Sequence, residues 1–222
     1  SIGTGAFKNS AISEISLSAK IKSIGNNAFE GCENLTAVSI PYSVTSIGNY
    51  AFKDCINLDT VALTAGINSI GNYAFENCAK IKEIYLPATL TSLGSNPFSG
   101  CTGLATFTVD DQNKTFSAKD GVLFDKNQKN LLIYPSSSTN ETFEMPDTVT
   151  SIAAGAFPGS QLKTIKLSAE LTTIPEGTFK NSKLLTSVVI PNSVSSIDNS
   201  AFEGCESLVT INISSYVTSM GD

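Results

Sequence analysis

Five cysteines are the residues of this sequence whose spacing first suggests chemistry. Four of them recur at one constant interval, and the fifth has the same place in a repeated motif: Cys32, Cys55, Cys78, Cys101 and Cys205. A zinc site normally has cysteines in close pairs such as CxxC, often with histidine, and this sequence contains neither. An odd number of cysteines in an oxidising compartment suggests an intermolecular disulfide. Serine stands at the equivalent position in other repeats, so a small, weakly polar side chain is sufficient there: Ser10, Ser160 and Ser182. We therefore predict five reduced thiols, buried as small apolar side chains; a bridge between neighbouring repeats is the alternative.

Other patterns of catalytic or metal-binding residues are missing. Without histidine there is no Ser-His-Asp triad, and neither a GxSxG nor a GxxxxGK[ST] motif occurs. Asp110, Asp111 and Asp120 do not have the spacing of a calcium-binding loop. A separated pair of carboxylates for glycoside hydrolysis is a pattern that a sequence alone does not reveal. We predict no enzyme activity, no metal site and no cofactor.

Composition narrows the classes of partner. The 222 residues carry a net charge of −6 with scattered charges and no basic run, which argues against binding to nucleic acid. No stretch of about 18 apolar residues is present, so we expect no membrane contact by this segment. The sequence begins and ends at the same place in its repeat. We interpret it as a segment of a longer polypeptide, with any signal or anchor outside it.

Phenylalanine shows where the repeat lies. It recurs at a nearly constant interval of about 23 residues, within the range that is typical of a solenoid, in which each repeat buries its apolar face against its neighbours. The one longer interval, between the fifth and sixth of these residues, equals one repeat plus an insert: Phe7, Phe29, Phe52, Phe75, Phe98, Phe157, Phe179 and Phe202. We predict one domain over residues 1–222, made of eight coils with an insert at about 110–145. Among the phenylalanines we expect a buried, stacked column, formed by Phe29, Phe52, Phe75 and Phe202.

Each repeat also predicts its own elements. An L-x-x-V-x-I segment, such as Leu35/Val38/Ile40, alternates as a strand with one buried face does, and proline often ends it. A second apolar pair such as Val44/Ile47 is expected to face inward. A glycine and a short helical turn around Ala-Phe are expected to close the coil. Asparagine and serine recur at fixed positions and are expected to bond loop backbone: Asn26, Asn49, Asn72 and Asn199, with Ser23, Ser46, Ser69, Ser92, Ser151 and Ser196.

The segment SIGNNAFEGCENLTAVSIP, residues 23–41, resembles the BspA-like leucine-rich repeat of bacterial surface proteins, whose unit is I-G-x-x-A-F-x-x-C-x-x-L. The resemblance covers residues 1–109 and 146–222. It implies a right-handed leucine-rich-repeat solenoid with one short parallel strand in each coil. It also implies an extracellular or cell-surface protein that adheres to host or bacterial proteins, and nothing catalytic.

The insert departs from the repeat. Residues 122–124 and 131–134 are apolar and flank the polar DKNQKN, which predicts a hairpin, and residues 135–143 predict a surface loop. Insertions in repeat proteins often lie on the binding face, although this one is equally well explained as a tolerated bulge. With little core to cover them, its aromatic residues are expected to be partly exposed: Phe116, Phe124 and Tyr134.

Three functions are consistent with these features. We expect a monomer that binds a protein of a host or bacterial surface through the outward positions of its strands, next to the insert. The predicted contact residues are Glu83, Tyr85, Thr106, Thr108, Phe116, Phe124, Tyr134 and Lys166. Tyr85 is the only aromatic residue on that face, and interface hot spots favour tyrosine. Glycan binding, which favours exposed aromatic residues, and a passive stalk that presents another domain are the alternatives.

Overall fold

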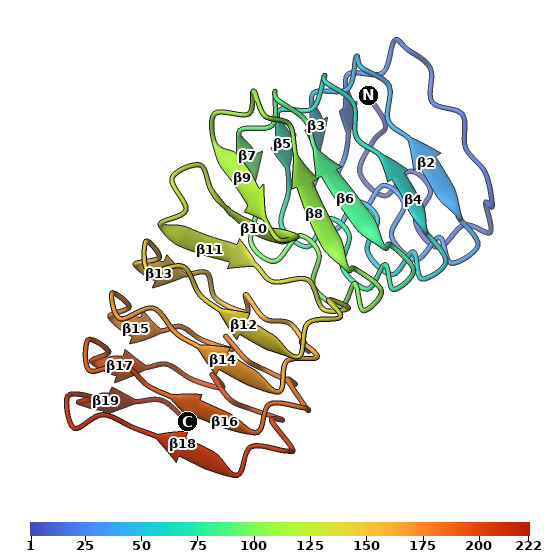
Figure 1. Cartoon of the computed structure of the whole chain (residues 1–222). Coiled ribbons are helices and arrows are strands. Elements are labelled where there is room, and N and C mark those ends of the chain that lie inside the picture. The colour runs from blue at the N-terminus through green and yellow to red at the C-terminus, as the bar shows by residue number, and fades with distance from the viewer. The chain divides into compact units, whose positions relative to one another are not determined.

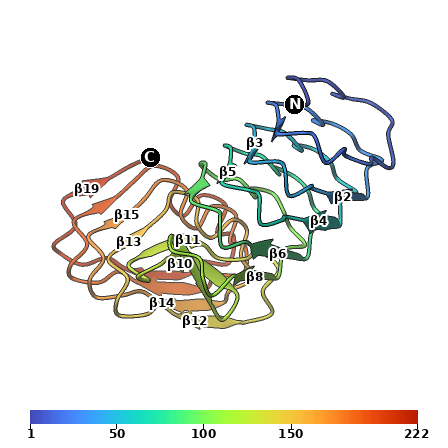
Figure 2. The same cartoon turned by 90° about the horizontal axis from the view of Figure 1, so that it is seen from above.

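The computed structural model describes residues 1–222 and shows two compact units, Ser1–Phe116 and Ser117–Asp222. Each unit is a stack of coils that follow one another in chain order (Figures 1 and 2). Parallel strands join neighbouring coils within each unit, as the repeat predicts. The placement of all residues in one domain stays a prediction.

The first unit has two sets of parallel strands. The longer strands form the pairs β2–β4 and β6–β8, and the two-residue strands form a sheet in the order β1-β3-β5-β7. Their bounds are β1 Ser23–Ile24, β2 Ala37–Ser39, β3 Ser46–Ile47, β4 Thr60–Ala62, β5 Ser69–Ile70, β6 Glu83–Leu86, β7 Ser92–Leu93 and β8 Thr106–Val109. The longer strands therefore do not form one continuous sheet, and the side chains of β4 and β6 do not explain the break between them.

The second unit contains the hairpin and further parallel strands, arranged in three sheets. Its sheets have the orders β13-β11-β10-β9, β12-β14-β16-β18 and β15-β17-β19. The pairing of β10 with β11 is antiparallel, which confirms the hairpin. The bounds are β9 Phe116–Lys119, β10 Val122–Asp125, β11 Asn130–Ile133, β12 Thr142–Glu144, β13 Ser151–Ile152, β14 Thr164–Lys166, β15 Thr173–Ile174, β16 Ser187–Val189, β17 Ser196–Ile197, β18 Thr210–Asn212 and β19 Ser219–Met220.

The Ala-Phe segment forms turns and not the expected helical turn. Its backbone N–H groups alternate between two kinds of partner, whereas in an α-helix each would bond the carbonyl four residues earlier. Ala28 N donates to Gly25 O within its own coil, but Phe29 N donates to Ala51 O of the next coil at 2.7 Å. Asn27 and Gly31 have φ of 55° and 70°, which also prevents a helix. These turns therefore add a hydrogen-bond ladder between coils.

Phenylalanines form one column in each unit. In the first unit, Phe7, Phe29, Phe52, Phe75 and Phe98 are stacked with ring centroids 5.0–5.5 Å apart. In the second, Tyr134, Phe157, Phe179 and Phe202 form a column of their own with centroids 4.9–5.3 Å apart, in which Phe157 and Phe179 are tilted by 33°. Phe29, Phe52 and Phe75 are fully buried, as predicted. Phe202 is only partly buried, because it is in the last coil and has a ring neighbour on one side only.

The predicted asparagine ladder is present. The Oδ1 atoms of Asn26 and Asn49 accept the backbone N–H of the asparagine one coil later, at 2.9 and 2.8 Å, and Asn72 does the same for Ser95. The glycine before each asparagine is required by this close approach. A Cβ on Gly48 would lie 2.6 Å from the backbone nitrogen of Asn26. These residues are therefore structural.

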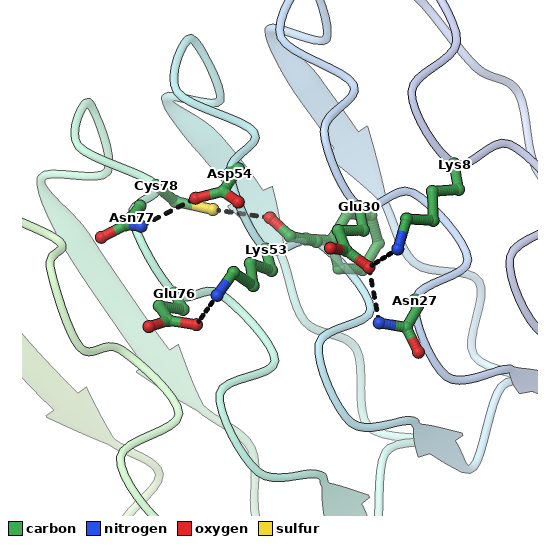
Figure 3. Close-up of polar contacts among 9 residues, drawn as sticks. Lys8, Asn27, Glu30, Lys53, Asp54, Glu76, Asn77 and Cys78 are labelled. Atoms are coloured by element: carbon green, nitrogen blue, oxygen red, sulfur yellow. Dashed lines mark hydrogen bonds and ion pairs between the residues drawn. The ribbon is translucent and has the colours of Figure 1, made fainter.

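Charged side chains also join neighbouring coils. Six ion pairs span one coil step, including Lys8–Glu30 at 2.8 Å and Lys53–Glu76 at 2.6 Å (Figure 3). The bond from Lys8 lowers the pKa of Glu30, and the bond to Glu76 raises the pKa of Lys53. Exposed pairs contribute at most about 1 kcal/mol each, so they favour correct alignment of the coils more than stability.

Candidate functional site

The cysteines form a buried column of hydrogen-bond donors. The thiol of Cys55 donates to the carbonyl oxygen of Phe29 at 3.1 Å, and that of Cys101 donates to the carbonyl of Phe75. Figure 3 shows the equivalent bond from Cys78 to the carbonyl of Phe52. Ser182 bonds the Phe157 carbonyl in the same way at 3.3 Å. This bond explains why only cysteine or serine has this position. The column is part of the core, and no group of three or more Cys, Asp or Glu side chains is arranged to hold a metal ion.

All five cysteines are free thiols in the structure, four of them buried and Cys205 partly exposed. We expect a thiol reagent at neutral pH to find about five groups in the denatured, non-reduced protein but close to one, Cys205, in the native protein. The count follows from absorbance of the released chromophore, and Cys205→Ser should bring the native count near zero. A count of three or one after denaturation would show that disulfides exist.

Four of the predicted contact residues lie together on the outward face of β6 and β8. The strands pair in parallel with Glu83 opposite Thr106 and Tyr85 opposite Thr108. Ile84 and Phe107, between them, are buried, which leaves the predicted residues on the outer side. Tyr85 is 45% exposed. We call these four residues, with Asp110, the β6–β8 face.

Asp110 was not among the predicted contact residues, but it belongs to this face. The hydroxyl of Tyr85 donates to Asp110 Oδ2 at 2.7 Å, and the N–H of Gln112 donates to Oδ1 at 2.9 Å. The bond from Tyr85 lowers the pKa of Asp110 and raises the pKa of Tyr85 itself. The sequence signal was the period-two alternation of Thr106, Thr108 and Asp110, which continues one residue beyond β8.

Lys166 lies on the corresponding face of the second unit. It is on β14, opposite Glu144 of β12, and its ammonium group forms an ion pair with that carboxylate. This bond raises the pKa of Lys166. The side chain of Lys166 therefore already has a partner of opposite charge.

The expected exposure of the aromatic residues in the insert was wrong. Phe116, Phe124 and Tyr134 are 6%, 1% and 0% exposed, so their side chains offer no contact surface. The reason is that the second half of the insert is itself a coil. Its β11 pairs in parallel with β13, and Tyr134 stacks on Phe157 at 5.1 Å in the place of a phenylalanine. The buried hydroxyl of Tyr134 bonds the hydroxyl of Ser138 at 3.2 Å.

Comparison with known proteins identifies the repeat. The sequence profile of the BspA type leucine rich repeat region matches six copies, over residues 1–127 and 134–222. A search of curated proteins finds no significant match. None of the structure's elements is a helix long and apolar enough to span a bilayer.

Several solved structures are similar. The pneumococcal vaccine antigen PcpA has a TM-score of 0.88 and 29% identity over 91% of this chain and 51% of its own. A leucine rich cell surface protein of Faecalibacterium prausnitzii A2-165 has a TM-score of 0.74 and 33% identity over 87% of this chain and 57% of its own. A leucine-rich repeat protein of Eubacterium ventriosum, at 22% identity and a TM-score of 0.61, shares the fold. The chain thus spans just over half the length of the first two proteins.

Proposed function

The chain belongs to the BspA-type leucine-rich repeat family, and from that premise we propose that it is a non-catalytic module of a cell surface that binds a host protein or a bacterial surface protein. One of the similar proteins is a vaccine antigen and another is a cell surface protein, which supports this location. The single observation that carries the binding proposal is the β6–β8 face, where an exposed tyrosine is surrounded by polar side chains.

The β6–β8 face is suited to binding because it has little part in holding the coil together. The stability of each coil comes from its inward side chains, such as Ile84 and Phe107, and from ladders to its neighbours. Tyr85 offers a large, rigid ring whose immobilisation loses little conformational entropy, as is typical of residues that dominate interfaces. Substitution there can therefore change recognition without changing the fold.

A passive spacer is the second candidate. The regular ladders and the six ion pairs between neighbouring coils favour a role in which the chain only presents another domain. A spacer would have no preferred partner. Glycan binding is less supported, because the sequence contains no tryptophan, and two of its six tyrosines, Tyr50 and Tyr73, stack on each other at 5.4 Å with Lys53 over the ring of Tyr50.

We expect Tyr85→Ala to weaken binding to a protein partner by at least about 2 kcal/mol, roughly a 30-fold loss of affinity, because the ring fills the centre of the interface. The parent chain is first screened against arrays of purified host extracellular proteins, purified bacterial surface proteins and glycans. The affinity of each protein that binds is then measured by surface plasmon resonance for the parent chain and for the Tyr85→Ala variant.

Tyr42→Ala is the matched control, because Tyr42 is 73% exposed and lies in the same unit but outside the β6–β8 face. Its affinity should equal that of the parent. Equal binding by the Tyr85→Ala variant would contradict the proposed site. Binding to glycans alone, or to nothing on any of the three arrays, would contradict the proposed function.

A further inference from the structure

The outward positions of the first unit have an unbalanced charge. The strand residues that point outward are Ala37, Ser39, Thr60, Ala62, Glu83, Tyr85, Thr106 and Thr108. Glu83 is the only charged residue among them, and Asp110 continues the alternation one residue beyond β8. Neither carboxylate belongs to any of the six ion pairs. No hydrogen bond from another residue to the exposed carboxylate of Glu83 is seen either.

The second unit provides the contrast. Its outward face also carries a carboxylate, Glu144, but Lys166 on the neighbouring strand neutralises it. At the equivalent place beside Glu83 the first unit has Thr106, which cannot neutralise the charge. The repeat therefore tolerates an internal cation on this face, and the β6–β8 face does not have one. A partner that supplies the cation would be electrostatically complementary.

We propose that the β6–β8 face receives arginine side chains of the protein partner, which pair with the carboxylates of Glu83 and Asp110 and pack against the ring of Tyr85. This inference rests on the proposed function and specifies what the partner presents. A guanidinium group has five N–H donors in one plane, can bond a carboxylate with two of them and stacks on aromatic rings. A lysine offers the charge without the planar fork, so it is expected to bind less tightly.

The groups on the face match these requirements. The ring of Tyr85 is half exposed, and its hydroxyl is fixed by Asp110 at 2.7 Å, which holds both side chains in place before a ligand arrives. Asp110 accepts one hydrogen bond on each oxygen and keeps a free lone pair on each. The hydroxyl groups of Thr106 and Thr108 border the site on the neighbouring strand and can accept the remaining N–H groups.

The test uses fluorescein-labelled peptides in which three arginines alternate with three serines, with matched peptides that carry lysine or citrulline. Citrulline has the shape of arginine without its charge. Affinities are measured by fluorescence anisotropy at ionic strengths of about 0.02 and about 0.15 M. The arginine peptide is expected to bind at least about tenfold more tightly than the citrulline peptide and about threefold more tightly than the lysine peptide.

Substitutions locate the site. We expect Glu83→Gln and Asp110→Asn each to weaken the arginine peptide by about threefold to tenfold, and Tyr85→Ala by a similar factor. Glu170→Gln removes the same charge from an exposed position of the second unit and should leave the affinity unchanged. Thermal melting of each variant, expected to match the parent, shows that the fold is kept.

Two outcomes would overturn the proposal. If Glu170→Gln weakens the peptide as much as Glu83→Gln does, the peptide is attracted only by the net charge of the chain. If a protein partner loses affinity with Tyr85→Ala but not with Glu83→Gln or Asp110→Asn, the proposed function stands and the arginine proposal fails. Conversely, arginine-specific peptide binding at this face by a chain that captures no protein would leave the site intact and contradict the protein-binding function.

Discussion

Replacing Phe52 by alanine is expected to lower the free energy of unfolding by about 3–5 kcal/mol. The ring is fully buried and lies between two others, with centroids 5.0 Å from Phe29 and 5.2 Å from Phe75. Truncation removes the transfer free energy of the ring and leaves a cavity. The stacked coils cannot close this cavity, because the hydrogen-bond ladders between them fix the spacing of their backbones. Native stability is typically about 5–15 kcal/mol, so the loss is a large part of the total.

Phe7→Ala is the matched control for this prediction. Phe7 has the same place in the repeat, but it is partly exposed and stacks on Phe29 alone. We expect roughly half the loss of stability, since fewer ring contacts and less buried area disappear. Urea unfolding followed by circular dichroism gives both values. A Phe52→Ala midpoint equal to that of the parent would show that the column does not stabilise the fold.

The regular part of the fold could be predicted from the sequence because every coil repeats the same apolar positions. Each position of the repeat occurs in several coils, so one coil with an atypical residue does not obscure the pattern. The prediction of a helical turn was wrong, because periodicity does not show which backbone groups bond to the next coil. Alternate N–H groups of this turn bond the next coil, as Phe29 N bonds Ala51 O, and such partners are distant in sequence.

The burial of Tyr134 in the insert was not predicted from the sequence. Tyr134 stands one full repeat interval before Phe157, but it lacks the neighbouring alanine, glycine and cysteine that mark the other coils. Tyrosine at a core position also needs a hydrogen-bond partner for its hydroxyl, and the partner, Ser138, lies in the segment that composition predicts to be a loop. The interval alone was the available signal, and it would have predicted a buried ring.

The candidate site was only partly accessible to sequence analysis. Alternation along the strands placed Glu83, Tyr85, Thr106 and Thr108 on one face, and the parallel pairing brings them together. The role of Asp110 depends on the position of the Tyr85 hydroxyl, and the pairing of Lys166 with Glu144 depends on the alignment of β12 and β14. Such contacts follow from tertiary geometry, which the order of residues does not specify.

The second large effect is expected at alkaline pH, from the buried thiols. Burial raises the pKa of Cys55 and of Cys101 from 9.0 to about 12, and it raises the pKa of Cys78 well above 9.0. An unfolded chain titrates its thiols near their ordinary pKa of about 8.5. Above that pH the unfolded state releases protons that the native state still holds, so stability falls as pH rises.

The size of this effect follows from proton linkage. The contribution of each thiol is complete below the unfolded pKa and is lost at about 1.4 kcal/mol per pH unit until the native pKa is reached. Cys55 and Cys101 together give a slope of about 3 kcal/mol per pH unit between roughly pH 9 and 12, and Cys78 adds to it in the same direction. We therefore expect the parent chain to unfold within about two pH units above the thiol pKa, since its total stability is of that order.

The variant in which Cys55, Cys78 and Cys101 are all replaced by serine isolates this effect. A serine hydroxyl can donate to the same phenylalanine carbonyls, as Ser182 already does to Phe157, but it does not titrate in this range. Deprotonation of lysine affects the parent and the variant alike and weakens the same ion pairs in both. Urea midpoints measured from pH 7 upward should therefore decline steeply for the parent above about pH 9 and much less for the variant. Parallel curves for the two proteins would show that the thiols do not hold their protons in the folded state, and the buried donor column would then need another explanation.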